Sequence, residues 1–105
     1  MTWAELKSPN DLVDFINDND ICLVTFSATW CGPCKASKPK LKTMAESSSL
    51  PFGYVYESDL EDFLDAMILI KKFPTAVLYK SGEEVERIAG NDFPGLEKML
   101  TEHAS

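Results

Sequence analysis

The 105-residue chain lacks several features that mark large classes of proteins. Its longest uninterrupted apolar run is residues 66–70, whereas a membrane-spanning helix needs about 20 apolar residues. It has no dense cluster of Lys and Arg, and its net charge is −7, so nucleic acids and anionic membranes are not expected as main partners. Residues 1–10 carry charges but no apolar stretch, so we expect no secretory signal peptide and a cytoplasmic location. No repeat or linker divides the sequence, which predicts one domain over residues 1–105. We also expect a monomer.

Cysteine is scarce, with three residues, Cys22, Cys31 and Cys34. Small secreted domains held together by disulfides usually carry four or more cysteines, in even number. Three cysteines therefore favour a reducing compartment, with either redox chemistry or metal binding at the close pair Cys31 and Cys34. Cys22 belongs to a short apolar run, where we expect a buried small hydrophobe.

The apolar patterns predict alternating helices and strands. Helical spacing and capping residues predict helices at residues 9–16, 32–47, 59–68 and 92–100. Short runs of strand formers predict strands at residues 1–6, 21–28, 52–56, 75–79 and 83–89. Ser8 and Ser58 are the expected N-caps, and Pro39 is expected to bend the second helix. The predicted fold class is α/β, a central mixed β-sheet flanked by helices on both faces, with parallel strands joined by a helix and an antiparallel terminal hairpin.

A Cys-Gly-Pro-Cys motif, residues 31–34, lies where a predicted strand gives way to a helix. Two cysteines three positions apart at a helix start can form a disulfide within one turn. Unpaired backbone N–H groups and the positive end of the helix dipole favour a thiolate on Cys31, and Lys35 adds a nearby positive charge. The thiolate is the nucleophile of disulfide exchange. The motif therefore predicts Cys31 as the nucleophile and Cys34 as the thiol that resolves the mixed disulfide.

A zinc site is the alternative for this cysteine pair. Structural zinc usually takes four Cys or His ligands. The further candidates are Cys22 and His103, and neither forms a second ligand pair. The ligand count therefore argues against a bound metal and leaves the redox-active disulfide Cys31–Cys34 as the expected reactive group, with no bound cofactor.

Residues 26–35 (Phe-Ser-Ala-Thr-Trp-Cys-Gly-Pro-Cys-Lys) resemble the active-site segment of the thioredoxin family, in the form closest to its animal members. The resemblance extends along essentially the whole chain. Pro39 matches the family's proline in the helix after the cysteines, residues 73–75 match its cis-proline segment, and Gly82 and Gly90 match two loop glycines. It implies the thioredoxin fold and protein-disulfide reductase activity on oxidised proteins. It also implies a thioredoxin reductase, or an equivalent donor, as the source of electrons.

The same resemblance implies a substrate groove beside the cysteines. Pro74 should be cis and should touch the nucleophile, so that Phe73 presents its backbone N–H and C=O to an extended substrate strand. Trp30 directly precedes the nucleophile, and we expect it to be partly exposed in an apolar rim with Pro33, Pro74 and Gly90. Gly32 and Pro33 leave little side-chain bulk over the sulfur atoms.

Two positions depart from the family pattern. Thr25 stands where thioredoxins usually carry a buried Asp assigned to proton transfer near the second cysteine. We therefore expect attack by Cys31 to be intact and resolution by Cys34 to be slowed, unless bulk water serves in place of the Asp. Lys71 and Lys72 precede the cis-proline segment, where they either favour acidic substrates or form a solvated helix end. These departures leave two alternatives open: a thioredoxin-like protein dedicated to one partner or weakly coupled to the ordinary reductase, and a non-catalytic binding subunit.

Overall fold

The computed structural model describes residues 2–60, 70 and 72–103. Within these residues, five strands form one mixed sheet in the order β1-β3-β2-β4-β5. Their bounds are β1 (Thr2–Leu6), β2 (Ile21–Ser27), β3 (Pro51–Tyr56), β4 (Thr75–Lys80) and β5 (Glu83–Ala89). Strands β1 and β2 run parallel to β3, whereas β4 is antiparallel to both β2 and β5. The predicted mixed sheet, including the short first strand, is confirmed.

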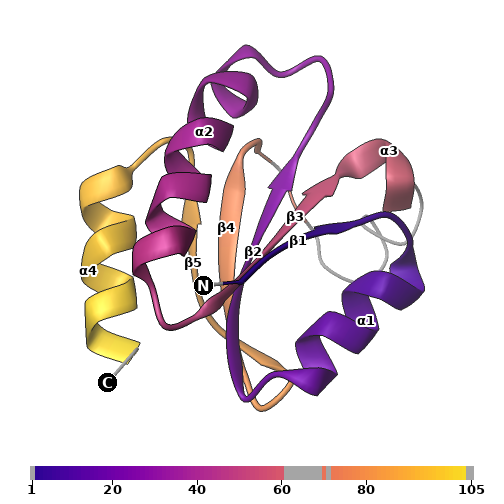
Figure 1. Ribbon diagram of the computed structural model, residues 1–105. Helices are drawn as coiled ribbons and strands as arrows, with labels where there is room; N and C mark the ends of the chain where they lie inside the picture. The colour runs from indigo at the N-terminus through magenta and orange to yellow at the C-terminus, as the bar shows by residue number, and fades with distance from the viewer. Residues whose placement is uncertain (1, 61–69, 71, 104–105) are drawn as a thin grey trace.

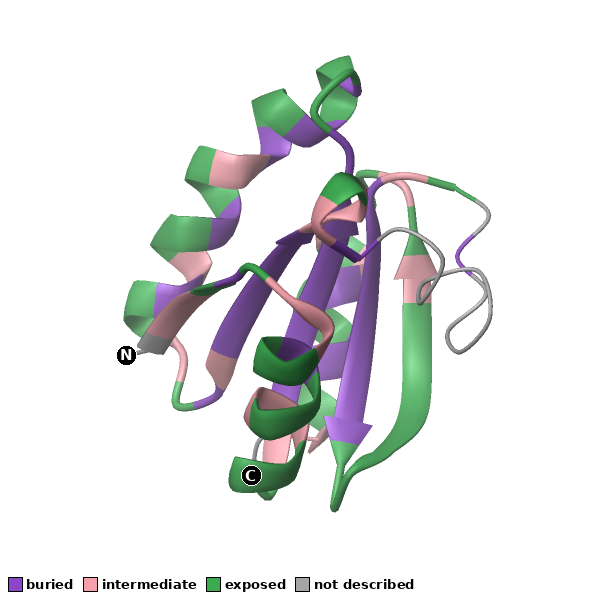
Figure 2. Cartoon of the chain, turned by 90° about the vertical axis from the view of Figure 1, so that its right-hand side faces the viewer, coloured by how far each residue is buried: buried purple, intermediate pink, exposed green. Residues whose placement is uncertain are grey.

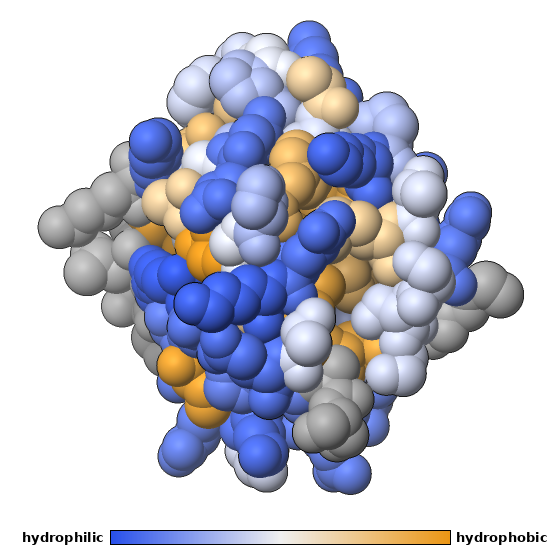
Figure 3. Space-filling view, turned by 90° about the vertical axis from the view of Figure 1, so that its left-hand side faces the viewer, coloured by the Kyte–Doolittle hydropathy of each residue, from blue (hydrophilic) through white to orange (hydrophobic). Residues whose placement is uncertain are grey.

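The helices cover both faces of this sheet, as the sequence predicts. Their described bounds are α1 (Pro9–Asp18), α2 (Gly32–Ser47), α3 (Glu57–Leu60) and α4 (Phe93–His103). Helices α2 and α4 lie on one side of the sheet, and α1 and α3 lie on the other (Figure 1). On the face that carries α4, hydrophilic side chains surround smaller hydrophobic areas (Figure 3).

Strand β2 runs through the middle of the sheet and is buried along almost its whole length (Figure 2). Its side chains alternate between the two cores. Val24 and Phe26 pack with Leu12 of α1, whereas Leu23 packs with the core under α2 and α4. Thr25, which alternates with Val24 and Phe26, therefore faces the α2 side. A strand buried on both faces explains why residues 21–28 read as a nearly continuous apolar run.

The helix boundaries agree with one of the two N-caps predicted from the sequence and differ from the other. Ser8 is the N-cap of α1, since its hydroxyl accepts a backbone N–H at 3.1 Å. Ser58 is not an N-cap, because β3 runs directly into a helix that already begins at Glu57. The remainder of that predicted helix, residues 61–69, lies outside the described residues. Helix α2 continues through Pro39 as one helix.

Strand β5 forms one edge of the sheet after a tight turn. The turn residues Ser81 and Gly82 have φ values of 55° and 82°, the left-handed geometry that suits a two-residue hairpin. Beyond the turn, residues 83–87 are all exposed. They include the three glutamates Glu83, Glu84 and Glu86. This edge of the sheet is therefore acidic.

Candidate active site

Cys31 and Cys34 form a disulfide at the junction of β2 and α2. Cys31 is the N-cap of α2, and Cys34 lies within its first turn, with 5.3 Å between the two Cα atoms. Both residues are buried, with 5% of Cys31 and 1% of Cys34 exposed. Cys31, at the helix end, is thus the more exposed residue of the pair.

The surroundings of Cys31 favour negative charge on its sulfur. The Cys34 backbone N–H donates to Cys31 Sγ at 3.2 Å. In the reduced protein, this donor and the positive end of the α2 dipole would stabilise a thiolate at the same place. The Phe73–Pro74 peptide bond is cis, as the resemblance implies, and the Phe73 carbonyl oxygen lies 3.7 Å from Cys31 Sγ. The nucleophile predicted from the sequence therefore faces a backbone carbonyl of the cis-proline loop.

Two hydroxyl groups contact the backbone of Cys34. Ser37 Oγ donates to the Cys34 carbonyl at 3.0 Å, and the Tyr54 hydroxyl donates to it at 3.5 Å. Ser37 is 2% exposed and belongs to the same buried face of α2 as Cys34 and Leu41. The prediction from sequence missed Ser37, although its position three residues after Cys34 places it on the same helix face.

The outer rim of the site is formed by Trp30 and Phe73. Trp30 is 69% exposed, and its ring meets that of Phe73 edge to face with 5.8 Å between centroids. Trp30 Nε1 donates to Glu57 Oε1 at 3.3 Å. Glu57 begins α3 and was not predicted, because 27 residues separate it from Trp30. The contact fixes one edge of an exposed aromatic ring beside the disulfide.

The loop between β5 and α4 joins two walls of the site. The Gly90 N–H donates to the Pro74 carbonyl at 2.7 Å, and Gly90 has a φ of +80°, which glycine adopts without strain. The next residue, Asn91, donates from Nδ2 to the Pro33 carbonyl at 3.1 Å. One loop therefore holds both the cis-proline segment and the first turn of α2. Asn91 was missed because 58 residues separate it from Pro33 and no local pattern marks such a pair.

The basic residues predicted near the site are exposed where they are described. Lys35 and Lys72 are both exposed. A Cβ atom added at Gly90 would lie 3.7 Å from Lys72 Nζ, so this ammonium group borders the loop that contacts Pro74. Lys71 lies outside the described residues. Gly32 is exposed, and a Cβ added there would meet nothing within 4 Å.

A cluster of partly exposed charged side chains adjoins Tyr54, whose hydroxyl contacts the Cys34 carbonyl. Lys38 Nζ lies 3.1 Å from the Tyr56 hydroxyl and 3.4 Å from Glu5 Oε1, and it lies 4.9 Å from the centre of the Tyr54 ring. Burial opposes the charge of Lys38, but its contacts with Tyr56 and Glu5 outweigh this and raise its pKa. Burial likewise opposes the charge of Glu5, while Lys38 lowers its pKa. Both groups therefore stay charged at neutral pH, next to the tyrosine that contacts the Cys34 carbonyl.

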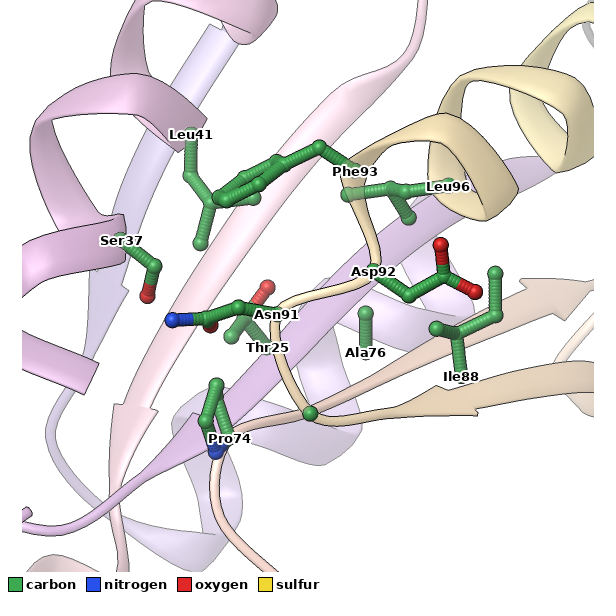
Figure 4. A pocket seen from close by; sticks show the side chains of 11 residues that line it. Thr25, Ser37, Leu41, Pro74, Ala76, Ile88, Asn91, Asp92, Phe93 and Leu96 are labelled. Atoms are coloured by element: carbon green, nitrogen blue, oxygen red, sulfur yellow. The ribbon is translucent and has the colours of Figure 1, made fainter. Parts of the chain in front are cut away.

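Thr25, the position that departs from the family pattern, is 3% exposed. It pairs with Tyr54 on β3 and with Ala76 on β4, in the middle of the sheet. Its side chain lines a cavity of about 20 Å³, which Ser37 and Asn91 also line (Figure 4). No carboxylate replaces the family's Asp at this point of the strand.

Cys22 and His103, the two further candidate metal ligands, belong to other parts of the fold than the cysteine pair. Cys22 is fully buried in the core under α1, and burial raises the pKa of its thiol to about 11. His103 ends α4, where its Nε2 lies 3.6 Å from Glu86 Oε2. Across the described part of the chain, no three His, Cys, Asp or Glu side chains gather as a metal site. Across the same residues, no helix has the length and hydropathy needed to cross a membrane.

Comparison with known proteins gives a consistent result. The thioredoxin family model matches residues 5–102. Thioredoxin from Mus musculus is 38% identical over 85 residues, covering 80% of each chain. Thioredoxin-2 from Pyricularia oryzae is 31% identical over 103 residues, or 96% of this chain but 59% of that protein. The structure of reduced Schistosoma mansoni thioredoxin pre-protein superposes with a TM-score of 0.91 at 32% identity, covering 97% of this chain and 98% of the other.

Proposed function

Because the chain belongs to the thioredoxin family of thiol-disulfide oxidoreductases, we propose that it reduces protein disulfides by dithiol–disulfide exchange through Cys31 and Cys34. The observation that carries the proposal is the disulfide at the N-terminus of α2, with a backbone N–H donated to Cys31 Sγ. This arrangement supplies an activated nucleophile and a second sulfur within bonding reach of it.

The reaction starts from the reduced pair. The Cys31 thiolate attacks one sulfur of a substrate disulfide, and the other substrate sulfur leaves as a thiolate that takes up a proton. Cys34 then loses its proton and attacks Cys31 Sγ. The bond between Cys31 and the substrate breaks, the second substrate thiol is released, and the Cys31–Cys34 disulfide forms. The substrate gains the two electrons that the cysteine pair gives up.

We assign substrate positioning to the groove beside the disulfide. The carbonyl of Phe73 beside Cys31 supports pairing with an extended substrate backbone, with Pro74 shaping that loop. We also assign Trp30 and Gly90 to the border of the groove, and main-chain pairing of this kind accepts many sequences. The exposed ammonium group of Lys72 favours substrates with acidic residues near their disulfide.

Gly32, Pro33 and Lys35 are assigned a supporting role at the helix start. Oxidised proteins are the proposed substrates, and a thioredoxin reductase or an equivalent donor returns the cysteine pair to the dithiol. We further propose that residues 1–105 act as one domain, as a monomer and in the cytoplasm, without a bound cofactor.

The second candidate is a thioredoxin-like protein that serves one partner or couples weakly to the ordinary reductase. Thr25 favours it, because a hydroxyl is not a base at neutral pH and resolution by Cys34 then lacks a carboxylate at this position of β2. A general reductase needs fast resolution with every substrate, whereas a dedicated protein needs it with one.

A turnover assay separates these candidates. A model protein disulfide is reduced with NADPH and a thioredoxin reductase as electron source, and in parallel with a chemical dithiol. Brisk turnover in both supports the general reductase, and turnover with the dithiol alone supports the dedicated protein. No turnover in either would refute the enzymatic function, as would full biological activity of a Cys31→Ser variant, which indicates a binding subunit.

A further inference from the structure

One peptide unit at the start of α2 is hydrogen-bonded at both of its ends. Its N–H end, the Cys34 amide, donates to Cys31 Sγ at 3.2 Å. Its C=O end, the Pro33 carbonyl, accepts from Asn91 Nδ2 at 3.1 Å. Because both bonds belong to the same peptide, the Asn91 amide, this peptide and the Cys31 sulfur form a chain of consecutive hydrogen bonds.

Hydrogen bonds in such a chain strengthen one another. A donor on the carbonyl oxygen draws electron density toward that oxygen, and the resonance of the peptide passes this polarisation on to the N–H group. The Cys34 N–H then carries more positive charge and is a stronger donor to the sulfur. A thiolate gains more from this donor than a neutral thiol does, because hydrogen bonds to ionised groups are roughly twice as strong as neutral ones.

The loop between β5 and α4 holds Asn91 in place for this bond. Before it, the Gly90 N–H donates to the Pro74 carbonyl at 2.7 Å. After it, Asp92 Oδ1 accepts from the Gly95 N–H in the first turn of α4 at 3.0 Å. Between these two anchors, the Asn91 side chain points from the loop toward α2 (Figure 4). Asn91 is exposed, but a solvent water on the same carbonyl would have to be immobilised first, at a cost in entropy that the anchored side chain does not carry.

We propose that Asn91 stabilises the Cys31 thiolate through the Pro33–Cys34 peptide, by strengthening the hydrogen bond that the Cys34 N–H donates to Cys31 Sγ. The proposal rests on the proposed function and adds a residue to its first step, the attack by Cys31. The bonds that form and break in that attack are unchanged. Asn91 is a positioning residue in this step, because it acts on the sulfur through the peptide.

The size of the effect follows from the bond that Asn91 modifies. Polarisation along a chain strengthens each hydrogen bond by about 10–30%. For a bond that ends on a charged sulfur, this corresponds to about a twofold change in the equilibrium between thiol and thiolate. Loss of the Asn91 donor should therefore raise the pH at which Cys31 is half ionised by about 0.3.

The test compares two variants that lack the donor with one matched control. Asn91→Ala removes the side-chain amide, and Asn91→Leu removes it but keeps a side chain of similar size. Asn10→Ala makes the same truncation at an exposed asparagine of α1. Each reduced protein is alkylated with iodoacetamide across a series of pH values, and mass analysis locates the label on Cys31. The rate of labelling against pH gives the midpoint of ionisation.

We expect the midpoint to rise by about 0.3 pH unit in both Asn91 variants and to stay at the native value in the control. In NMR spectra of the reduced, isotope-labelled proteins, the Cys34 amide proton should move upfield in both variants, as a weakened hydrogen bond requires. The rate of attack at a single pH is a poorer readout, because a more basic thiolate is also more nucleophilic.

Three results would overturn this role of Asn91 alone. They are an unchanged midpoint, an unmoved Cys34 amide resonance, and a shift in Asn91→Ala that Asn91→Leu does not reproduce, since the last would show that bulk and not the donor matters. A native protein whose Cys31 ionises but attacks no protein disulfide would instead overturn the proposed function.

Discussion

Replacing Thr25 by Asp should speed resolution of the mixed disulfide and make stability depend on pH. Thr25 is buried in the middle of β2 and faces the cavity of about 20 Å³ on the α2 side of the sheet. A carboxylate introduced there is a base close to the face of α2 that carries Cys34. A positioned general base contributes about 10²–10⁴-fold, so resolution at pH 7 should be at least about 100-fold faster, with attack by Cys31 unchanged.

The stability cost follows from the burial of that position. Burial raises the pKa of a carboxyl, by up to about 3–5 units when the group is fully buried, and a hydrogen bond from the second N–H of Asn91 would limit the rise. A rise of about 3 units, from about 3.9 to about 7, corresponds to about 4 kcal/mol at pH 7. The folded state then binds the proton more tightly than the unfolded state. Thr25→Asp should therefore be most stable below about pH 4 and lose about 1.4 kcal/mol per unit between about pH 4 and pH 7.

Two measurements check both halves of this prediction. Quenched single-turnover kinetics gives the resolution rate, and urea unfolding at pH 4, 5.5 and 7, values chosen to span about 3.9 to 7, gives the stability. Thr43→Asp, on the exposed face of α2, is the matched control and should change neither. Resolution no faster than in the native protein would show that proton removal from Cys34 is not limited by the missing carboxylate. A stability difference independent of pH would show that the introduced carboxyl is not buried.

Three further predictions concern groups around the site and at the sheet edge. Cys22 should resist alkylation in the folded protein up to about pH 10, because burial raises its thiol pKa to about 11. Mass analysis of the alkylated protein before and after unfolding checks this. Labelling of the folded protein at pH 8, near the model-peptide pKa of about 8.5, would contradict it. Gly90→Ala should destabilise the fold by about 1–2 kcal/mol, because φ is +80° there and the Gly90 N–H holds the Pro74 carbonyl; a thermal unfolding curve unchanged from the native protein would contradict this. Arg87 Nε lies 2.6 Å from Glu84 Oε2, and the hydrogen bond from Arg87 lowers the pKa of Glu84. Glu84→Gln should therefore lower the free energy of unfolding by at most about 1 kcal/mol at pH 7. This difference should disappear in about 1 M salt, or as pH falls through the lowered pKa of Glu84. A difference that does not depend on salt would count against an ion-pair origin.

The sheet could be predicted from the sequence because its patterns are local. Continuous apolar runs mark strands buried on both faces, and the helix between residues 21–28 and 52–56 requires those two strands to be parallel. Ser8 and its acceptor bond lie within one helical turn. Ser58 shows the limit of such signals, since its capping pattern is present but β3 leads straight into a helix that starts one residue earlier.

The candidate site was only partly accessible to this kind of prediction. Cys31 and Cys34 could be predicted because their spacing allows a disulfide within one turn and their place at a helix start stabilises a thiolate. Asn91 and Glu57 reach the site only through the tertiary fold, which brings them to Pro33 and Trp30 from other loops. The cavity next to Thr25 is a product of packing between β2, α2, β4, β5 and α4, and no sequence pattern encodes its volume.

The acidic edge at β5 has a consequence for how copies of this protein meet. An edge strand presents unpaired backbone groups that invite pairing with a strand of another molecule, and charged side chains oppose such pairing. Glu83, Glu84 and Glu86 stand exposed on this edge, so two copies approaching edge to edge would bring like charges together. The repulsion lasts only while the carboxylates are ionised. Acidification below about pH 4 would remove it, and self-association through β5 becomes the expected route of aggregation in acid.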